Sequence, residues 1–141
     1  MVVVEEYEEF EMEKELPYKI LGMEMVAVKR IGFDAAHYLP GYEGKCSQVH
    51  GHHWVVELGV RGLVKDDGMV VDFTLLGEFL KSRVHGRLDH TLLNDVIENP
   101  TAENICLWVK ETYWIWFGGL DVRLEFIRIW ETENSYVEVR G

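Results

Sequence analysis

The 141-residue sequence contains only two cysteines, Cys46 and Cys106, and no apolar run long enough to cross a membrane. A membrane-spanning helix needs about 20 consecutive apolar residues. A secretory signal is also missing, because Met1 is followed by three valines and then by glutamates. We therefore expect a cytoplasmic protein with no membrane partner, in which a structural disulfide is unfavoured.

Positive charge is also scarce. The chain has 14 Lys and Arg against 25 Asp and Glu, which gives a formal net charge of −11. Nucleic acids and anionic membranes are bound through basic patches, so this balance argues against both partners. It leaves room for a small anionic substrate, because a few local cations can outweigh the overall field. Apolar residues make up 48% of the chain, which is typical of one folded domain.

The first 22 residues differ in composition from the rest. Seven glutamates lie between Glu5 and Glu15, and Pro17 ends the stretch. We predict an acidic N-terminal extension over residues 1–22 and a single domain over residues 23–141. The extension is interpreted as a solvated arm, with an oligomer contact through its scattered apolar residues as the alternative.

The spacing of apolar residues predicts the elements of the domain. Alternation with period two indicates strands, and spacings of three and four indicate helices. Strands are predicted over residues 23–37, 50–61, 69–73, 121–130 and 136–139, and helices over residues 74–84 and 101–117. This order indicates an α+β fold in which helices cover one face of a mainly antiparallel sheet.

Three histidines form a candidate metal site. His50 and His52 are two residues apart in a strand and therefore share a face, and Gly51 between them lets the backbone approach closely. His37 ends the preceding strand, so antiparallel pairing would bring it to the same end of the sheet. Three neutral nitrogens and an open position are typical of catalytic zinc. Imidazoles also bind copper, iron and nickel, and ordinary strand-end histidines are the alternative.

The two cysteines have different surroundings. Cys46 lies four residues before His50, next to Lys45, in a loop. A cation and a nearby metal favour the thiolate, so Cys46 is a candidate base or nucleophile, with a passive thiol as the alternative. Cys106 lies between apolar residues of a predicted helix, and we expect it in the core.

Three other polar residues are candidates for chemistry. Asp89 and His90 are adjacent and suggest either a proton-transfer unit or a loop-stabilising contact. Glu131 follows a long apolar strand, so it either leaves the core at its rim or accepts two hydrogen bonds from a planar ligand. His53 is expected on the face opposite His52, and His85 in a solvent-facing loop.

Together these segments resemble the 6-pyruvoyl-tetrahydropterin synthase superfamily, and most closely the 6-carboxytetrahydropterin synthases of the queuosine pathway. The resemblance runs in order from about residue 23 to the end of the chain. Its most specific element is the pattern Cys-x-x-x-His-Gly-His. The matching segments are Phe33–His37, Lys45–His52, Gly68–Phe73, Leu88–Asp95, Glu98–Asn104 and Glu131–Thr132.

The resemblance implies a tunnelling fold, in which a four-stranded antiparallel sheet carries two helices on one face. It also implies that subunits join their sheets into a barrel, commonly as a homohexamer of two trimers with active sites at the interfaces. Exposed sheet edges would favour such pairing.

The resemblance also implies roles for individual residues. His37, His50 and His52 would hold Zn²⁺, and Cys46 would act as the proton-abstracting base. Further roles fall on Asp89 and His90 as the proton relay, on Glu131 as the anchor of the pterin ring, and on Thr101 and Glu103 near the pterin pocket.

The implied reaction is that of a zinc-dependent lyase. Its substrate would be 7,8-dihydroneopterin triphosphate, and its products 6-carboxy-5,6,7,8-tetrahydropterin, triphosphate and acetaldehyde. Lys45, Arg83 and Arg87 would screen the triphosphate. Three alternatives remain open: a 6-pyruvoyltetrahydropterin synthase, a non-catalytic zinc- or pterin-binding protein of the same fold, and an unrelated zinc hydrolase or hydratase. Glu133 and His53 depart from the family's pattern, and Glu133 is expected to alter the charge of the pocket.

Overall fold

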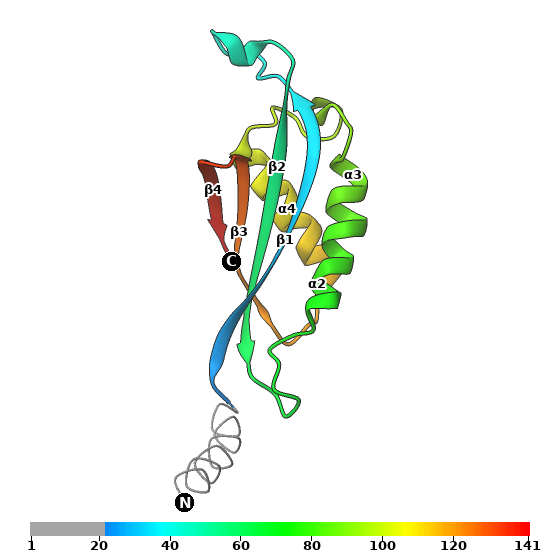
Figure 1. Cartoon of the computed structure of the whole chain (residues 1–141), viewed down its shortest axis with the longest axis vertical. Helices are drawn as coiled ribbons and strands as arrows, with labels where there is room; N and C mark the ends of the chain where they lie inside the picture. The colour runs from blue at the N-terminus through cyan, green and yellow to red at the C-terminus, as the bar shows by residue number, and fades with distance from the viewer. Residues whose placement is uncertain (1–21) are drawn as a thin grey trace, which may run out of the picture.

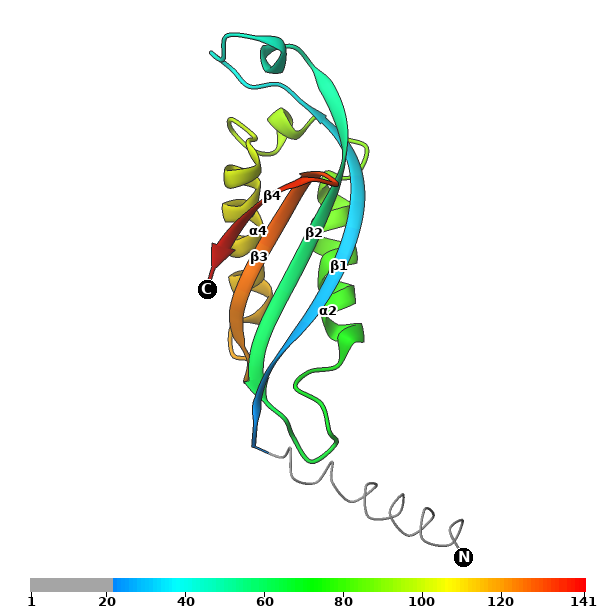
Figure 2. The ribbon, with the colours of Figure 1, turned by 60° about the vertical axis from the view of Figure 1, so that its left-hand side comes forward.

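The computed structural model describes residues 22–141 and contains one four-stranded sheet in the order β1-β2-β3-β4. Every neighbouring pair of strands is antiparallel. The strands are β1 (Glu24–His37), β2 (His50–Leu63), β3 (Arg123–Thr132) and β4 (Ser135–Arg140). Helices lie against one face of the sheet (Figures 1 and 2), so the predicted α+β fold with its helix-covered antiparallel sheet is confirmed.

Two helical segments cover that face. The first runs without a break through α2 (Phe73–Phe79), the π-helical η3 (Leu80–His85) and α3 (Gly86–Leu88). The second is α4 (Ala102–Phe117), which begins as predicted at Thr101, where the hydroxyl oxygen accepts a hydrogen bond from the Asn104 amide at 3.1 Å. Two short 3₁₀ turns complete the fold: η2 (Lys45–Ser47) and η4 (Leu93–Asp95).

The core lies between the sheet and the helices. Alternate strand residues point toward the helices, while the helices present residues spaced by three and four toward the sheet. Fully buried members include Phe33, Trp54, Val56, Leu58, Ile127 and Ile129 from the strands, and Leu76, Phe79, Leu80, Ile105, Val109 and Tyr113 from the helices. This packing holds the strand ends that carry the candidate site.

Two local predictions are wrong. Residues 69–73 form bends and the start of α2 rather than a strand, although Val70 and Val71 are buried. A short apolar run looks the same whether a strand or a packed loop buries it. His85 lies in η3 rather than in a loop, because the helical segment continues for four residues beyond its predicted end at residue 84.

The face without helices carries a network of ion pairs. Arg61 lies 2.8 Å from Glu125, while Arg128 and Arg140 each approach Glu138 to 2.6 Å. Cross-strand pairing of opposite charges makes this face compatible with water, in contrast to the apolar helix-covered face.

The predicted extension over residues 1–22 lies, apart from Gly22, outside the described residues, and the division at residue 22 stays a prediction. None of the helices in residues 22–141 combines the length and the apolar character that a bilayer crossing requires. β1 and β4 are the two edge strands of the sheet within one chain.

Candidate metal centre and active site

The candidate site lies where the β1–β2 pair extends past the rest of the sheet. β1 and β2 pair as far as His37 opposite His50, whereas β3 joins β2 only from Val55 onward. The predicted antiparallel register is therefore correct. It brings ring nitrogens of His37, His50 and His52 within 4.8 Å of one another, so these three residues could hold a metal ion.

Backbone carbonyls fix the rings of two of these histidines. His37 Nδ1 lies 2.7 Å from the Pro100 carbonyl oxygen, and His50 Nδ1 lies 2.8 Å from that of Gln48. A carbonyl can only accept, so each Nδ1 carries the proton and each Nε2 offers a lone pair. Such outer partners orient the histidines of metal sites.

The two Nε2 atoms with free lone pairs lie close together. Nε2 of His37 and Nε2 of His50 are 3.0 Å apart. Two lone pairs at this distance repel one another unless a proton or a cation lies between them. Nitrogens sharing a tetrahedral zinc ion at about 2.1 Å would be about 3.4 Å apart, so the observed spacing suits a metal.

His52 completes the set. Its Nε2 is buried without a hydrogen-bond partner among the described residues. Burial, the largest effect, lowers the pKa of His52, and His37 and His50 lower it further, while Glu131 opposes them. Trp54 packs beneath, 5.0 Å from His37 and 5.3 Å from His52 between ring centroids. An orphaned, neutral nitrogen beside two others fits a metal such as zinc.

Cys46 and Glu131 border the same pocket as two of the three histidines. Lys45, Cys46, His50, His52 and Glu131 line an open pocket of about 510 Å³. Cys46 is half-buried in η2. Oε1 of Glu131 lies 3.3 Å from His52 Nε2, without the geometry of a hydrogen bond. The structure thus brings the predicted ligands, base and carboxylate together at one place.

Cys106 behaves as predicted for a core residue. It is buried in α4, and its thiol donates to the Val137 carbonyl at 3.4 Å. Burial raises the pKa of the Cys106 thiol to about 12, which makes it unreactive at neutral pH.

Asp89 and His90 form a direct pair. His90 Nδ1 lies 2.6 Å from Asp89 Oδ2, and Asp89 Oδ1 accepts from the backbone amide of Asp34 at 2.9 Å. Adjacent residues can meet in this way because His90 has a left-handed backbone conformation, with φ of 57°. The amide of Asp34 and then His90 lower the pKa of Asp89, and Asp89 in turn raises the pKa of His90.

A single chain does not bring this pair into the pocket of Cys46. His90 instead borders a shallow hollow with Asp34, His52 and His53. Thr101 and Glu103, predicted near the pterin, also stay outside the Cys46 pocket as described. The hydroxyl of Thr101 caps α4, and Glu103 is exposed in the first turn. Their binding role stays a prediction.

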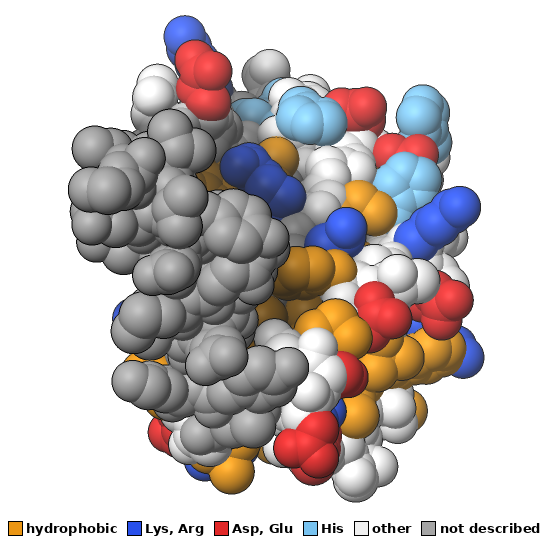
Figure 3. All heavy atoms as spheres, turned by 60° about the horizontal axis from the view of Figure 1, so that its bottom comes forward, with side chains coloured by type: hydrophobic (Ala, Val, Ile, Leu, Met, Phe, Trp, Pro, Cys, Tyr) orange, Lys and Arg blue, Asp and Glu red, His pale blue; other side chains and the backbone are white. Residues whose placement is uncertain are grey.

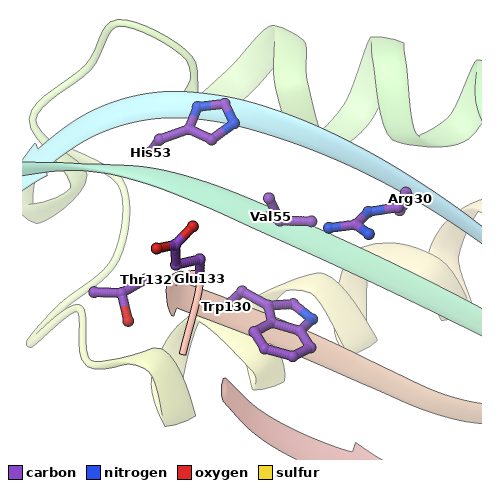
Figure 4. A pocket seen from close by; sticks show the side chains of 6 residues that line it. All are labelled: Arg30, His53, Val55, Trp130, Thr132 and Glu133. Carbon is purple, nitrogen blue, oxygen red and sulfur yellow. The ribbon is translucent and has the colours of Figure 1, made fainter. Parts of the chain in front are cut away.

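His53 points away from the metal site, as its place in the strand predicts. It hydrogen-bonds to Asp34 at 2.8 Å and is well exposed. With Arg30, Trp130 and Glu133 it lines a separate hollow of about 250 Å³ on the helix-free face (Figure 4). Glu133 therefore borders this second hollow and not the pocket of Cys46, and its effect on the charge of that pocket stays a prediction. Histidine side chains reach the surface at one end of the molecule (Figure 3).

Sequence reasoning missed the groups that orient the metal ligands and Asp89. The carbonyls of Gln48 and Pro100 and the amide of Asp34 are backbone atoms, which carry no residue-specific signal. Pro100 lies in the loop before α4, 63 residues from the histidine that it orients.

Comparison with known proteins agrees with this geometry. The model of the 6-pyruvoyl tetrahydropterin synthase family matches residues 27–141. The chain belongs to this family. The resemblance found in the sequence is therefore confirmed.

Individual relatives cover most of the chain. An Archaeoglobus fulgidus protein provisionally named 6-carboxy-5,6,7,8-tetrahydropterin synthase is 43% identical over 117 residues, which are 83% of this chain and 96% of the relative. A Pyrococcus furiosus protein named dihydroneopterin monophosphate aldolase is 38% identical over 112 residues, covering 79% and 94%. The structure of Caenorhabditis elegans 6-pyruvoyl tetrahydropterin synthase is similar with a TM-score of 0.73, at 25% identity, covering 86% and 98%. This likeness agrees with the tunnelling fold.

Proposed function

We propose that this protein is a zinc-dependent lyase that converts 7,8-dihydroneopterin triphosphate and water to 6-carboxy-5,6,7,8-tetrahydropterin, triphosphate and acetaldehyde. The observation that carries the proposal is the shared pocket. Cys46, Glu131 and two of the three histidines line it, and the histidine rings are set with free Nε2 atoms. The names of the A. fulgidus and other relatives support this choice of reaction.

The two ends of the pocket would have different roles, one in binding the pterin ring and the other in reacting with the substrate side chain. The Glu131 carboxylate would accept two hydrogen bonds from adjacent N–H groups of the pterin ring and so orient the substrate. Cys46 would then remove a proton from the side chain of the substrate. A zinc ion bound by the histidines would supply Lewis acidity to the side-chain hydroxyls.

Assembly is part of the proposal. The Asp89–His90 pair lies outside the Cys46 pocket of its own chain, whereas a relay must reach the reacting atoms. We propose a homohexamer of two trimers in which neighbouring subunits complete each pocket. The exposed edge of β1, with Met25, Val26 and Val28 at its surface, suits pairing with a second sheet edge. The predicted cytoplasmic location belongs to this proposal.

Product analysis tests the reaction. Zinc-loaded protein should release both triphosphate and acetaldehyde from 7,8-dihydroneopterin triphosphate. Triphosphate without acetaldehyde would instead indicate a 6-pyruvoyltetrahydropterin synthase, and release of neither product would indicate a binding protein. The same assay with 7,8-dihydroneopterin monophosphate addresses the activity named for the P. furiosus relative. Preference for the monophosphate would overturn the proposal.

The Glu131→Gln variant tests whether Glu131 binds the pterin ring or the metal. Because Glu131 Oε1 lies 3.3 Å from a ligand nitrogen, its loss has to be measured on metal and pterin separately. We expect Glu131→Gln to weaken pterin binding by roughly 10- to 100-fold, since a charged acceptor is lost, while zinc content is unchanged. Unchanged pterin affinity with zinc lost would assign Glu131 to the metal and favour the hydrolase alternative.

A further inference from the structure

One histidine near the Asp89–His90 pair has no role in the proposed reaction. His85 lies at the end of η3, one helical turn before Asp89, and is partly exposed. Its Nε2 lies 3.5 Å from Asp89 Oδ2. His90 Nδ1 approaches the same oxygen to 2.6 Å. Asp89 is thus a carboxylate shared by two imidazoles.

The remaining contact of Asp89 fixes its orientation from the other side. Oδ1 accepts from the Asp34 amide at 2.9 Å, and the His90 amide donates to the Asp34 carbonyl. Asp89 is 20% exposed, whereas His90 is 80% exposed. The carboxylate is therefore held between β1 and the helix that carries His85, while the His90 ring projects toward solvent.

The other charged groups near this cluster have different partners. Arg83 lies over the Trp116 ring at 4.7 Å, and Arg87 lies 6.0 Å from the Trp108 ring, so both contact α4. On the sheet side, Asp34 pairs with His53 at 2.8 Å, and its negative charge also raises the pKa of His90. Within residues 22–141, His85 is thus the one helical side chain within ion-pair distance of Asp89.

We infer that His85 is a positioning residue for the Asp89–His90 relay, because it shares Oδ2 with His90 and holds the carboxylate in place. The inference rests on the proposed function. An N–H group or a positive charge on the His85 ring competes with His90 for the lone pairs and the negative charge of Asp89. Asp89 raises the pKa of His90, and we expect His85, whose charge lowers the pKa of Asp89, to weaken that effect. The result is a relay that gives up its proton more readily than an isolated Asp–His pair.

Two substitutions separate the N–H donor of the His85 ring from its charge. His85→Ala removes both, whereas His85→Gln keeps an N–H donor without a titrating ring. Lys81→Ala is the matched control, because it removes a cation one turn earlier in η3 and has no ion pair with Asp89. Circular dichroism and zinc content verify that each variant is folded and loaded.

The first readout does not depend on turnover. NMR of protein labelled with ¹³C at histidine Cε1 follows the titration of His90 in the zinc-loaded wild type and each variant. The pKa of His90 should move upward in His85→Ala and remain unchanged in Lys81→Ala. An unchanged His90 titration in His85→Ala would overturn the inference.

The second readout is steady-state kinetics with 7,8-dihydroneopterin triphosphate. His85→Ala should lower kcat by about 2- to 10-fold with unchanged KM, a small part of the ~10²–10⁴-fold that proton transfer contributes. His85→Gln should restore most of kcat. A kcat equal to wild type in His85→Ala would also contradict the inference. If the wild type itself does not turn over this substrate, the proposed function fails, and the NMR titration still decides the role of His85.

Discussion

The six histidines of this chain fall into two groups of three that differ in what surrounds their ring nitrogens. His37, His50 and His52 converge on one another, and backbone carbonyls hold two of them. The other three each contact a carboxylate: His53 contacts Asp34, and both His85 and His90 contact Asp89. The first group is arranged to hold a cation, whereas each member of the second group faces a carboxylate.

Electrostatics explains the difference. A neutral carbonyl fixes a tautomer without attracting a second proton, so the opposite nitrogen stays free for a metal. A carboxylate stabilises the imidazolium and raises the pKa of the ring, as it does for His90. Burial lowers the pKa of His52 and outweighs the neighbouring carboxylate of Glu131, which alone would raise it.

Removing one member of the converging group should have the largest effect. We expect His50→Ala to lose zinc affinity by more than the roughly 10- to 100-fold that loss of an outer partner costs, and to lose turnover with it. His90→Ala should keep the zinc content of the wild type. Metal analysis after dialysis measures both. Zinc loss in His90→Ala would erase the distinction between the two groups.

Cys46→Ala separates catalysis from metal binding at the site of the first group. Turnover should fall by roughly 10²–10⁴-fold, because the proton-abstracting base is lost, while the zinc content stays the same. Cys106→Ala is the matched control and should retain kcat, since that thiol is buried in the core and away from the pocket. Near-normal turnover in Cys46→Ala would remove this residue from the mechanism.

The pH dependence of stability tests the second group. The raised pKa of His90 means that its stabilising contribution is complete below its ordinary value of 6.5 and is lost as pH rises through the folded-state pKa. The lowered pKa of Asp89 makes its contribution complete above its ordinary value of 3.8 and lost as pH falls through the folded-state pKa. His90→Gln should therefore flatten the dependence of unfolding free energy on pH above 6.5. Urea denaturation across this range measures it, and identical profiles would contradict the assignment.

His53→Gln should have the smallest effect. His53 is 64% exposed, and exposed ion pairs contribute little to stability. The melting temperature should change by about 2 °C or less, with zinc content and kcat unchanged. A loss of zinc comparable to that of His50→Ala would show that His53 belongs to the metal site despite pointing to the other face.

Much of the fold followed from the apolar pattern. Long alternating strands such as β2 and the spaced apolar residues of α4 are strong local signals, and their predicted bounds agree with the structure to within two residues. The strand predicted over residues 69–73 was wrong because an apolar run this short shows no periodicity that would distinguish a strand from a buried loop. The predicted helix end before His85 was wrong because the last helical residues, Gly86–Leu88, include a glycine next to an arginine, a pattern that is typical of a loop.

The sequence by itself determined which histidines share a face, because alternation along a strand is local and needs no tertiary contact. It also determined, through the family motifs, that the chain is a member of this family. Only the tertiary structure decided which ring nitrogens are free and which carry protons. That choice depends on backbone atoms such as the Pro100 carbonyl, and on Asp34 meeting Asp89 across 55 residues. Backbone groups are identical at almost every position, so only packing selects the ones that reach a side chain.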